Sequence, residues 1–226
     1  IEANADFAVP IPLTIISEML GIPEPDRAQL IDWSHAIVGM YELSTQDDMG
    51  PAAEQATIEF VAYVRSVVEQ RRSNPGDDLM TALIQVEEEG ERLTEDELIA
   101  TCILLLNAGH EATVHAIGNG LQALAAHPDQ MDLLREHPEH LPTGVEELLR
   151  YDTPLQMFER WVLEDTEWEG YSLERGSKVG LLMGAANRDP FRFDQPGELD
   201  LTRSDNPHVS WGGGIHHCLG APLARI

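Results

Sequence analysis

The chain has 226 residues, 42% of them hydrophobic, which is enough for one globular domain with a sizeable core. Its 40 acidic and 14 basic residues give a formal net charge of −26, so nucleic acid and anionic membranes are disfavoured as partners. The longest apolar run, Leu98–Leu106, is broken by Thr101 and is far shorter than the roughly 20 residues that a membrane-spanning helix needs. Two cysteines outside any disulfide framework fit a reducing compartment, and we expect a cytoplasmic protein.

Helical spacing of apolar residues predicts four helices in the first part of the chain. They are expected over residues 13–20, 26–38, 52–72 and 77–89. An irregular segment over residues 1–12 precedes the first helix, and a polar break over residues 45–51 separates the second from the third. Gly21 and Gly90 are expected to end the first and the last of these helices.

A capping box at Thr94 and Glu97, in which side chains satisfy the free N–H groups at a helix start, predicts a fifth helix. Its apolar pattern continues to about His127, which gives a rod on the order of 50 Å long. Glu111 lies in the middle of this largely apolar stretch. Because burying an unpaired carboxylate is costly, Glu111 is a candidate functional residue, and the alternative is that it faces solvent.

The last part of the sequence predicts shorter elements. Helices are expected over residues 129–135 and after Pro142, the second ending near Tyr151. Short strands are expected at residues 160–164, 168–171 and 178–183. Arg175 and Gly176 form a turn between the last two, and the predicted fold class is mainly α with minor β.

Residues 211–220, WGGGIHHCLG, combine three glycines with a cysteine that precedes a predicted helix. Glycines allow a tight loop, and amide N–H groups at a helix start stabilise a thiolate, so Cys218 is a candidate metal ligand. The alternatives are a buried apolar cysteine, a zinc site with His216 and His217, and a Cys–His nucleophile. Structural zinc needs four ligands, and Cys102 lies in an apolar helical run, which disfavours zinc.

This stretch resembles the haem-binding loop of the cytochrome P-450 family, FGxGxHxCxG, with Trp211 in place of the usual Phe. The matching residues are Gly212, Gly214, His216, Cys218 and Gly220. The resemblance implies the fold of that family, with a long central helix over the cysteine loop. It implies haem b (iron protoporphyrin IX) with the Cys218 thiolate as axial ligand. It also implies that residues 1–226 are a single domain incomplete at both ends.

Residues 108–113, AGHEAT, match the oxygen-binding motif AGx[D/E]TT of the family's central helix. The resemblance implies that Gly109 lets the helix bulge where dioxygen binds and that Glu111 supplies protons there. Ala108 would then lie against the haem.

Ala112 departs from this motif, because the family usually has a threonine whose hydroxyl orders the water that delivers protons. Thr113 is one residue late and, at about 100° per residue, points elsewhere. Proton delivery then falls to water held by Glu111 or Asn107, or to a hydroxyl of the substrate. A peroxide-driven or substrate-assisted reaction therefore stays open.

Glu147 and Arg150 form an ExxR pair on one helix face. Alone, this pattern usually marks a surface salt bridge. Its position between the two other matches implies the family's structural pair, which joins a further arginine to hold the core on the haem side. Arg192 is the best candidate for that third member.

The resemblance also assigns the remaining site residues. The expected haem-propionate contacts are Arg160, His208 and His216. The expected substrate pocket is lined by Leu105, Ala108, Leu155, Gln156, Met157 and Phe158.

The implied reaction inserts one oxygen atom from dioxygen into a small, largely apolar organic substrate. The electrons would come from a ferredoxin-like or flavin-containing donor. One alternative, which Ala112 favours, is a peroxide-driven haem enzyme or a haem-binding protein without monooxygenation. The other is an inactive fragment that cannot hold haem.

Overall fold

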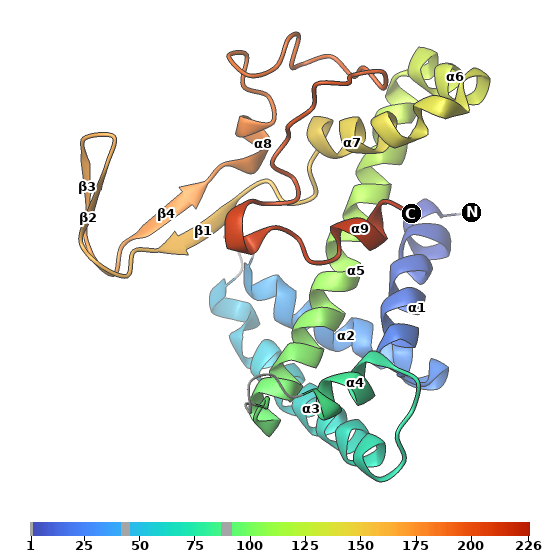
Figure 1. The fold of residues 1–226 in the computed structure, drawn as a ribbon, viewed down its shortest axis with the longest axis vertical. Helices are drawn as coiled ribbons and strands as arrows, with labels where there is room; N and C mark the ends of the chain where they lie inside the picture. The colour runs from blue at the N-terminus through green and yellow to red at the C-terminus, as the bar shows by residue number, and fades with distance from the viewer. Residues whose placement is uncertain (1, 42–45, 87–91) are drawn as a thin grey trace. The chain divides into compact units, whose positions relative to one another are not determined.

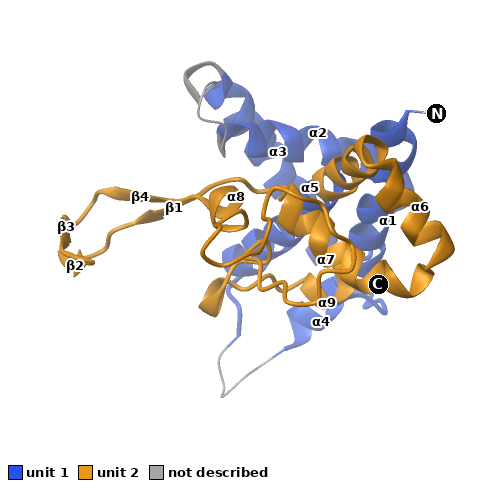
Figure 2. Ribbon diagram, turned by 90° about the horizontal axis from the view of Figure 1, so that it is seen from above, with its two compact units in different colours: residues 1–114 blue, residues 115–226 orange. Residues whose placement is uncertain are grey.

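A computed structural model describes residues 2–41, 46–86 and 92–226 and shows a mainly helical chain with a little β structure (Figure 1). The predicted fold class is therefore confirmed. The chain divides into two compact units, Ile1–Val114 and His115–Ile226 (Figure 2). Helix α5, Glu95–Ala126, contributes to both units. The single domain expected over residues 1–226 stays a prediction.

The first unit is built of helices that share one hydrophobic core. They are α1 (Pro10–Met19), α2 (Arg27–Val38), α3 (Gln46–Ser73), α4 (Leu79–Gln85) and the first part of α5. A π-helical turn (Asn4–Ala8) precedes α1, and 3-10 turns (Glu24–Asp26 and Gly39–Tyr41) flank α2. Large buried side chains of the core include Leu20, Leu30, Phe60, Met80 and Leu98.

The three largest differences between predicted and observed helix ends in this unit are at the start of α1, the start of α3 and the end of α4. α1 begins at Pro10, because proline suits the first turn of a helix, where its missing N–H is not needed. The polar break is wrong over residues 46–51, which form the start of α3 with Pro51 inside the helix. α4 ends at Gln85, and the predicted stop at Gly90 lies outside the described residues.

The capping box that begins α5 is confirmed. Thr94 N–H donates to Glu97 Oε2 at 2.9 Å, and Glu97 N–H donates to Thr94 Oγ1 at 3.3 Å. The helix then continues for 32 residues, which corresponds to about 50 Å at 1.5 Å per residue.

The second unit combines the rest of α5 with short helices and strands. They are α6 (Pro128–Glu136), a 3-10 turn (Pro138–His140), α7 (Leu141–Tyr151), β1 (Phe158–Trp161), β2 (Thr166–Trp168), β3 (Tyr171–Leu173), β4 (Lys178–Leu181), α8 (Met183–Ala186), a 3-10 turn (Gly214–His216) and α9 (Ala221–Ala224). β1 pairs antiparallel with β4, and β2 pairs antiparallel with β3. Between α8 and Gly214 the chain has no helix or strand (Figure 1).

The strand predicted over residues 168–171 is wrong, because its centre is the turn between β2 and β3. Glu169 and Gly170 both have positive φ angles, 50° and 82°, as the two central residues of a tight hairpin turn often do. The predicted turn at Gly176 is confirmed by its φ of 86°. Within the described ranges, no helix is both long and apolar enough to cross a membrane.

Candidate functional site

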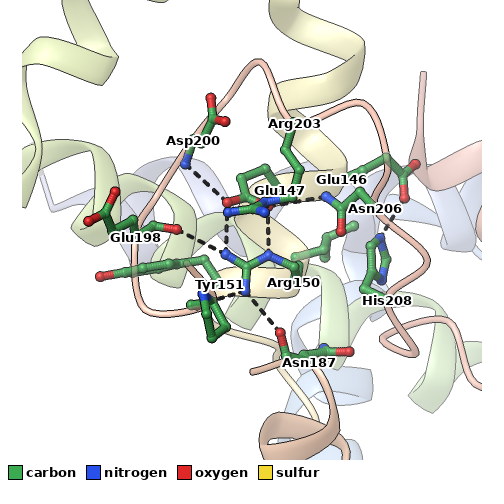
Figure 3. Close-up of polar contacts among 12 residues, drawn as sticks. Glu146, Glu147, Arg150, Tyr151, Asn187, Glu198, Asp200, Arg203, Asn206 and His208 are labelled. Carbon is green, nitrogen blue, oxygen red and sulfur yellow. Dashed lines mark hydrogen bonds and ion pairs between the residues drawn. The ribbon is translucent and has the colours of Figure 1, made fainter. Parts of the chain in front are cut away.

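A buried ion pair in α7 also binds the chain that follows α8, residues 187–213, which has no helix or strand and is called the irregular segment below. The side chains of Glu147 and Arg150 are fully buried, and Arg150 donates to both carboxylate oxygens of Glu147 at 2.7 and 2.8 Å (Figure 3). Its other donors reach the carbonyl oxygens of Asn187, Pro196 and Glu198 at 2.9 to 3.0 Å. All five guanidinium N–H groups therefore have an acceptor, which a buried arginine requires.

The third member of this cluster is Arg203, so the prediction of Arg192 is wrong. Arg203 Nε donates to Glu147 Oε2 at 3.1 Å, and Asn206 Nδ2 donates to the same oxygen at 3.2 Å (Figure 3). Arg192 instead pairs with Asp205 at 3.2 Å on the exposed surface. Both arginines lie in the irregular segment, where no periodic pattern tells which side chain turns inward.

The loop before Cys218 is tight, as the glycines predict. Gly212 has a φ of 71°, and a Cβ added there would lie 2.9 Å from the carbonyl oxygen of His216. Gly214 also has a positive φ, 60°. The N–H of Cys218 donates to the carbonyl oxygen of Trp211 at 2.7 Å and closes the loop. The conformation therefore requires glycine at position 212 both for its backbone angle and for space.

Cys218 is a half-buried free cysteine between two exposed apolar side chains. Ile215 is 97% exposed and Leu219 is 84% exposed. Because α9 is only four residues long, its dipole lends the sulfur little stabilisation. A soft sulfur donor framed by uncovered apolar groups fits a haem, whose iron binds thiolate and whose flat apolar ring covers such groups.

Glu146 anchors this loop, although no motif of the sequence predicted this role. Its Oε2 accepts from Trp211 Nε1 at 3.0 Å, from His208 Nε2 at 2.8 Å and from Arg225 Nη2 at 3.3 Å. The Arg225 guanidinium also lies 4.8 Å from the centre of the Trp211 ring. Although burial raises the pKa of Glu146, these hydrogen bonds lower it to about 2. The departure of Trp211 from the family pattern was the available signal, because indole has an N–H that Phe lacks.

His208, which the resemblance assigns to a haem propionate, has protein partners at both ring nitrogens, and its propionate role stays a prediction. Besides the bond to Glu146, Nδ1 of the buried ring accepts from the Ser210 N–H at 3.2 Å. Burial lowers the pKa of His208 despite the nearby carboxylate. His216 and Arg160 remain available. Among the described residues, Arg160 donates to the Glu159 carbonyl oxygen at 2.9 Å and has no carboxylate partner.

Glu111 does not face solvent, so that alternative is wrong. Its side chain is only 13% exposed, and Ser34 Oγ donates to Glu111 Oε1 at 3.2 Å. His35 Nε2 and His110 Nε2 each lie 3.4 Å from the same oxygen. Glu111 is therefore a shielded carboxylate surrounded by groups that can exchange protons with it.

Gly109 has a packing role that the motif did not indicate. A Cβ at this position would lie 2.9 Å from Ile16 Cγ1, so the missing side chain lets α1 approach α5 closely. The helix stays α-helical through Gly109, and the bulge expected there is absent.

The other predicted site residues are divided between the two units. Leu105 packs against the core of the first unit, while Ala108 is exposed. Leu155 and Phe158 are exposed in the second unit, and Gln156 Nε2 donates to the Thr153 carbonyl oxygen at 2.8 Å. The pocket expected from these residues and Met157, and the roles expected of Ala112, Thr113 and Gly220, stay predictions.

Comparison with known proteins agrees with this fold and loop. The cytochrome P450 family model matches residues 34–226. Cytochrome P450 CYP107DY1 of Priestia megaterium is 43% identical over 222 residues, which are 98% of this chain and 53% of that protein. 6-Deoxyerythronolide B hydroxylase of Saccharopolyspora erythraea is 42% identical over 97% of this chain and 54% of its own length. The crystal structure of myxobacterial CYP267B1 in complex with myristic acid is 40% identical, with a TM-score of 0.93 over 100% of this chain and 55% of that one.

These findings define a class of protein, the haem-thiolate proteins, in which a cysteine loop belongs to a mainly helical fold. The chain belongs to the cytochrome P450 family. It spans about half the length of the curated relatives it matches.

The low pKa of Glu146 predicts an acid dependence of stability. A carboxylate whose pKa falls from 4.5 to about 2 on folding stabilises the fold fully above pH 4.5, and this stabilisation is lost as the pH falls towards 2. Glu146→Gln is expected to lower the free energy of unfolding at neutral pH and to flatten its decline between these two pH values. Urea unfolding of the intact protein at a series of pH values measures both effects.

Glu136→Gln, an exposed change on α6, is the matched control and should keep the acid dependence of the unchanged protein. The same decline in Glu146→Gln and in this control would show that the Glu146 carboxylate is not the source of the acid dependence.

Proposed function

We propose that this chain is part of a haem-thiolate monooxygenase that inserts one oxygen atom from dioxygen into a small, largely apolar substrate. The observation that carries the proposal is the Cys218 loop, a free half-buried sulfur framed by exposed Ile215 and Leu219 in a P450 fold. When bound, haem supplies the activation of dioxygen, and an axial thiolate favours O–O cleavage.

The residues that would hold the cofactor lie in the second unit. Cys218 would ligate the iron, and Arg160 and His216 would bind the propionates, because charge-assisted hydrogen bonds to carboxylates are strong. Glu146 would keep the loop in place through Trp211 and Arg225.

Proton delivery falls to Glu111, which would hold a proton on its carboxylate and receive the next from its neighbours. Ser34 and His35 lie within 3.2 and 3.4 Å of its Oε1. One helical turn earlier, Asn107 Oδ1 is buried with no hydrogen-bond partner among the described residues. An orphaned acceptor of this kind is a place where an ordered water is expected, and such a water could relay protons to Glu111.

Exposed apolar side chains and two relatives support the proposed substrate class. Leu155 and Phe158 offer apolar surface, and two relatives are respectively a hydroxylase and a structure holding myristic acid. We take myristic acid as the first substrate to test. The electrons would come from a ferredoxin-like or flavin-containing donor.

Turnover in labelled dioxygen tests this function. The intact protein, loaded with haem and supplied with a ferredoxin, its reductase and NADPH, is expected to hydroxylate myristic acid. The product should carry one labelled oxygen by mass spectrometry. Product formed with hydrogen peroxide alone, and none with NADPH and dioxygen, would overturn the proposal in favour of a peroxide-driven enzyme.

Ala112 is the specific reason to keep that second candidate, and it yields a prediction. Because a threonine hydroxyl at this position orders the proton-delivering water in the family, Ala112→Thr is expected to raise the product formed per NADPH oxidised several-fold. Ala125→Thr, at an exposed position of the same helix, should leave this ratio unchanged. Equal ratios in both variants would show that Ala112 does not limit proton delivery.

A further inference from the structure

Two histidines converge on Glu111 in the first unit. His35 comes from α2, while His110 and Glu111 are adjacent on α5. One ligand atom from each residue lies within 4.8 Å of the others, and both Nε2 atoms are 3.4 Å from Glu111 Oε1. Nitrogen and carboxylate ligands in such a group could hold a metal ion.

His110 gives the strongest indication of a ligand, because it is buried and only one of its two ring nitrogens has a hydrogen-bond partner among the described residues. Its side chain is 3% exposed, and its Nδ1 lies 3.1 Å from the Leu106 carbonyl oxygen. Since a carbonyl only accepts, Nδ1 carries the proton, and a neutral ring then has its lone pair on Nε2. That Nε2 is buried without a hydrogen-bond partner in the described structure, and it lies beside Glu111.

This arrangement is typical of histidine that binds a metal. Such a histidine commonly donates its second ring N–H to a backbone carbonyl, which fixes the tautomer and aims the other nitrogen at the ion. A buried lone pair without a partner otherwise costs free energy. The Leu106 carbonyl oxygen therefore supplies the hydrogen bond that orients His110 as a metal ligand.

The distances also fit a small coordination sphere. Zinc bonds to nitrogen and oxygen are about 2.0–2.2 Å long, so two ligands of a tetrahedral site lie about 3.4 Å apart. Both histidine-to-carboxylate distances have this value. His35 is 58% exposed, so its ring can close the remaining gap to His110 at little packing cost.

We infer that His35, His110 and Glu111 form a binding site for a divalent transition-metal cation, with Zn²⁺ as the probe. Two imidazoles and one carboxylate suit zinc and its neighbours in the first transition row, whereas Ca²⁺ and Mg²⁺ prefer sites made of oxygen ligands only. Three protein ligands leave a coordination position for water.

The consequence for catalysis rests on the proposed function. A carboxylate oxygen that coordinates a cation cannot take up and release protons freely. Occupation of the site by Zn²⁺ is therefore expected to slow NADPH-driven turnover by removing Glu111 from proton delivery.

Zinc binding to the intact, haem-loaded protein tests the site without reference to activity. After chelator treatment, competition with a chromogenic zinc indicator at about pH 7.5, where histidine is mostly neutral, gives the stoichiometry and affinity. The protein is expected to bind one more Zn²⁺ than His35→Ala, or to bind it at least about tenfold more tightly. His115→Ala, an exposed change on the same helix, is the matched control and should bind as the unchanged protein does.

Equal binding by the unchanged protein, His35→Ala and His115→Ala would overturn the inference and leave an ordinary cluster of ionisable groups. Zinc sites formed by other residues contribute equally to all three proteins, so they do not affect the comparison. Zinc that binds through His35 without slowing turnover would support the metal site and would contradict the proton-delivery role of Glu111. The experiment thus distinguishes a failure of the metal site from a failure of the proposed role of Glu111 in proton delivery.

Discussion

Replacing Arg150 by Met is expected to lower the free energy of unfolding of the intact protein by about 3 to 5 kcal/mol. The change removes one partner of a fully buried ion pair and leaves the Glu147 carboxylate with too few donors. It also removes the donors to three carbonyl oxygens of the irregular segment, those of Asn187, Pro196 and Glu198. Because a domain is typically stable by about 5 to 15 kcal/mol, this loss is a large part of the total.

Arg192→Met is the matched control. Its ion pair with Asp205 is exposed, and exposed pairs contribute about 0 to 1 kcal/mol. Denaturant unfolding followed by circular dichroism measures both variants. Equal unfolding free energies for Arg150→Met and Arg192→Met would show that the buried cluster does not hold the irregular segment in place.

The features that the sequence predicts well are those that depend on neighbours in the chain. The capping box of Thr94 and Glu97 and the tight loop at Gly212 involve residues a few positions apart, so their patterns identify them directly. Glu147 and Arg150 likewise share one helix face. For such local geometry, the number of residues between two positions determines whether their side chains are neighbours in space.

The choice of Arg192 over Arg203 fails for the opposite reason. Residues 187–213 have no helix or strand, so no periodicity tells which side chains turn inward. Arg203 reaches Glu147 across 56 positions of the sequence. Only the path of the backbone decides this contact.

His208 and Glu146 illustrate what a family resemblance leaves out. The resemblance assigns His208 to a propionate and does not indicate that its buried ring binds Glu146. Glu146 itself looks like an ordinary helix-surface residue beside a motif. Its importance comes from Trp211 and Arg225, two partners far along the chain that converge on one carboxylate.

Gly109 has a different role in the structure from the one that the motif predicts. The motif predicts a helix bulge, whereas the structure shows an unbroken α-helix with Ile16 filling the space of the missing side chain. The cluster of His35 with His110 was not predicted either, because α2 and α5 are far apart in sequence. A carboxylate at position 111, within an otherwise apolar stretch of helix, was the local sign of it.

The second large effect is expected at Cys218. The loop around it is shaped by Gly212, by the Trp211 carbonyl oxygen that accepts from the Cys218 N–H, and by Glu146. None of these contacts uses the sulfur, so Cys218→Ala should fold with the loop intact and lose only the axial ligand.

Cys102→Ala provides the matched control, because Cys102 is the other cysteine of the chain. Its side chain is buried in the core of the first unit, where burial raises the pKa of its thiol to about 11. A thiol that stays protonated in an apolar core is not a metal ligand. This variant should therefore keep haem bound through sulfur.

The most direct measurement is the absorption spectrum of the intact, haem-loaded protein, reduced and then exposed to carbon monoxide. We predict a strongly red-shifted Soret band, which reports thiolate ligation, in the unchanged protein and in Cys102→Ala, and its absence in Cys218→Ala. A spectrum typical of histidine-ligated haem in the unchanged protein, or a red-shifted band that persists in Cys218→Ala, would contradict the assignment of Cys218 as the axial ligand.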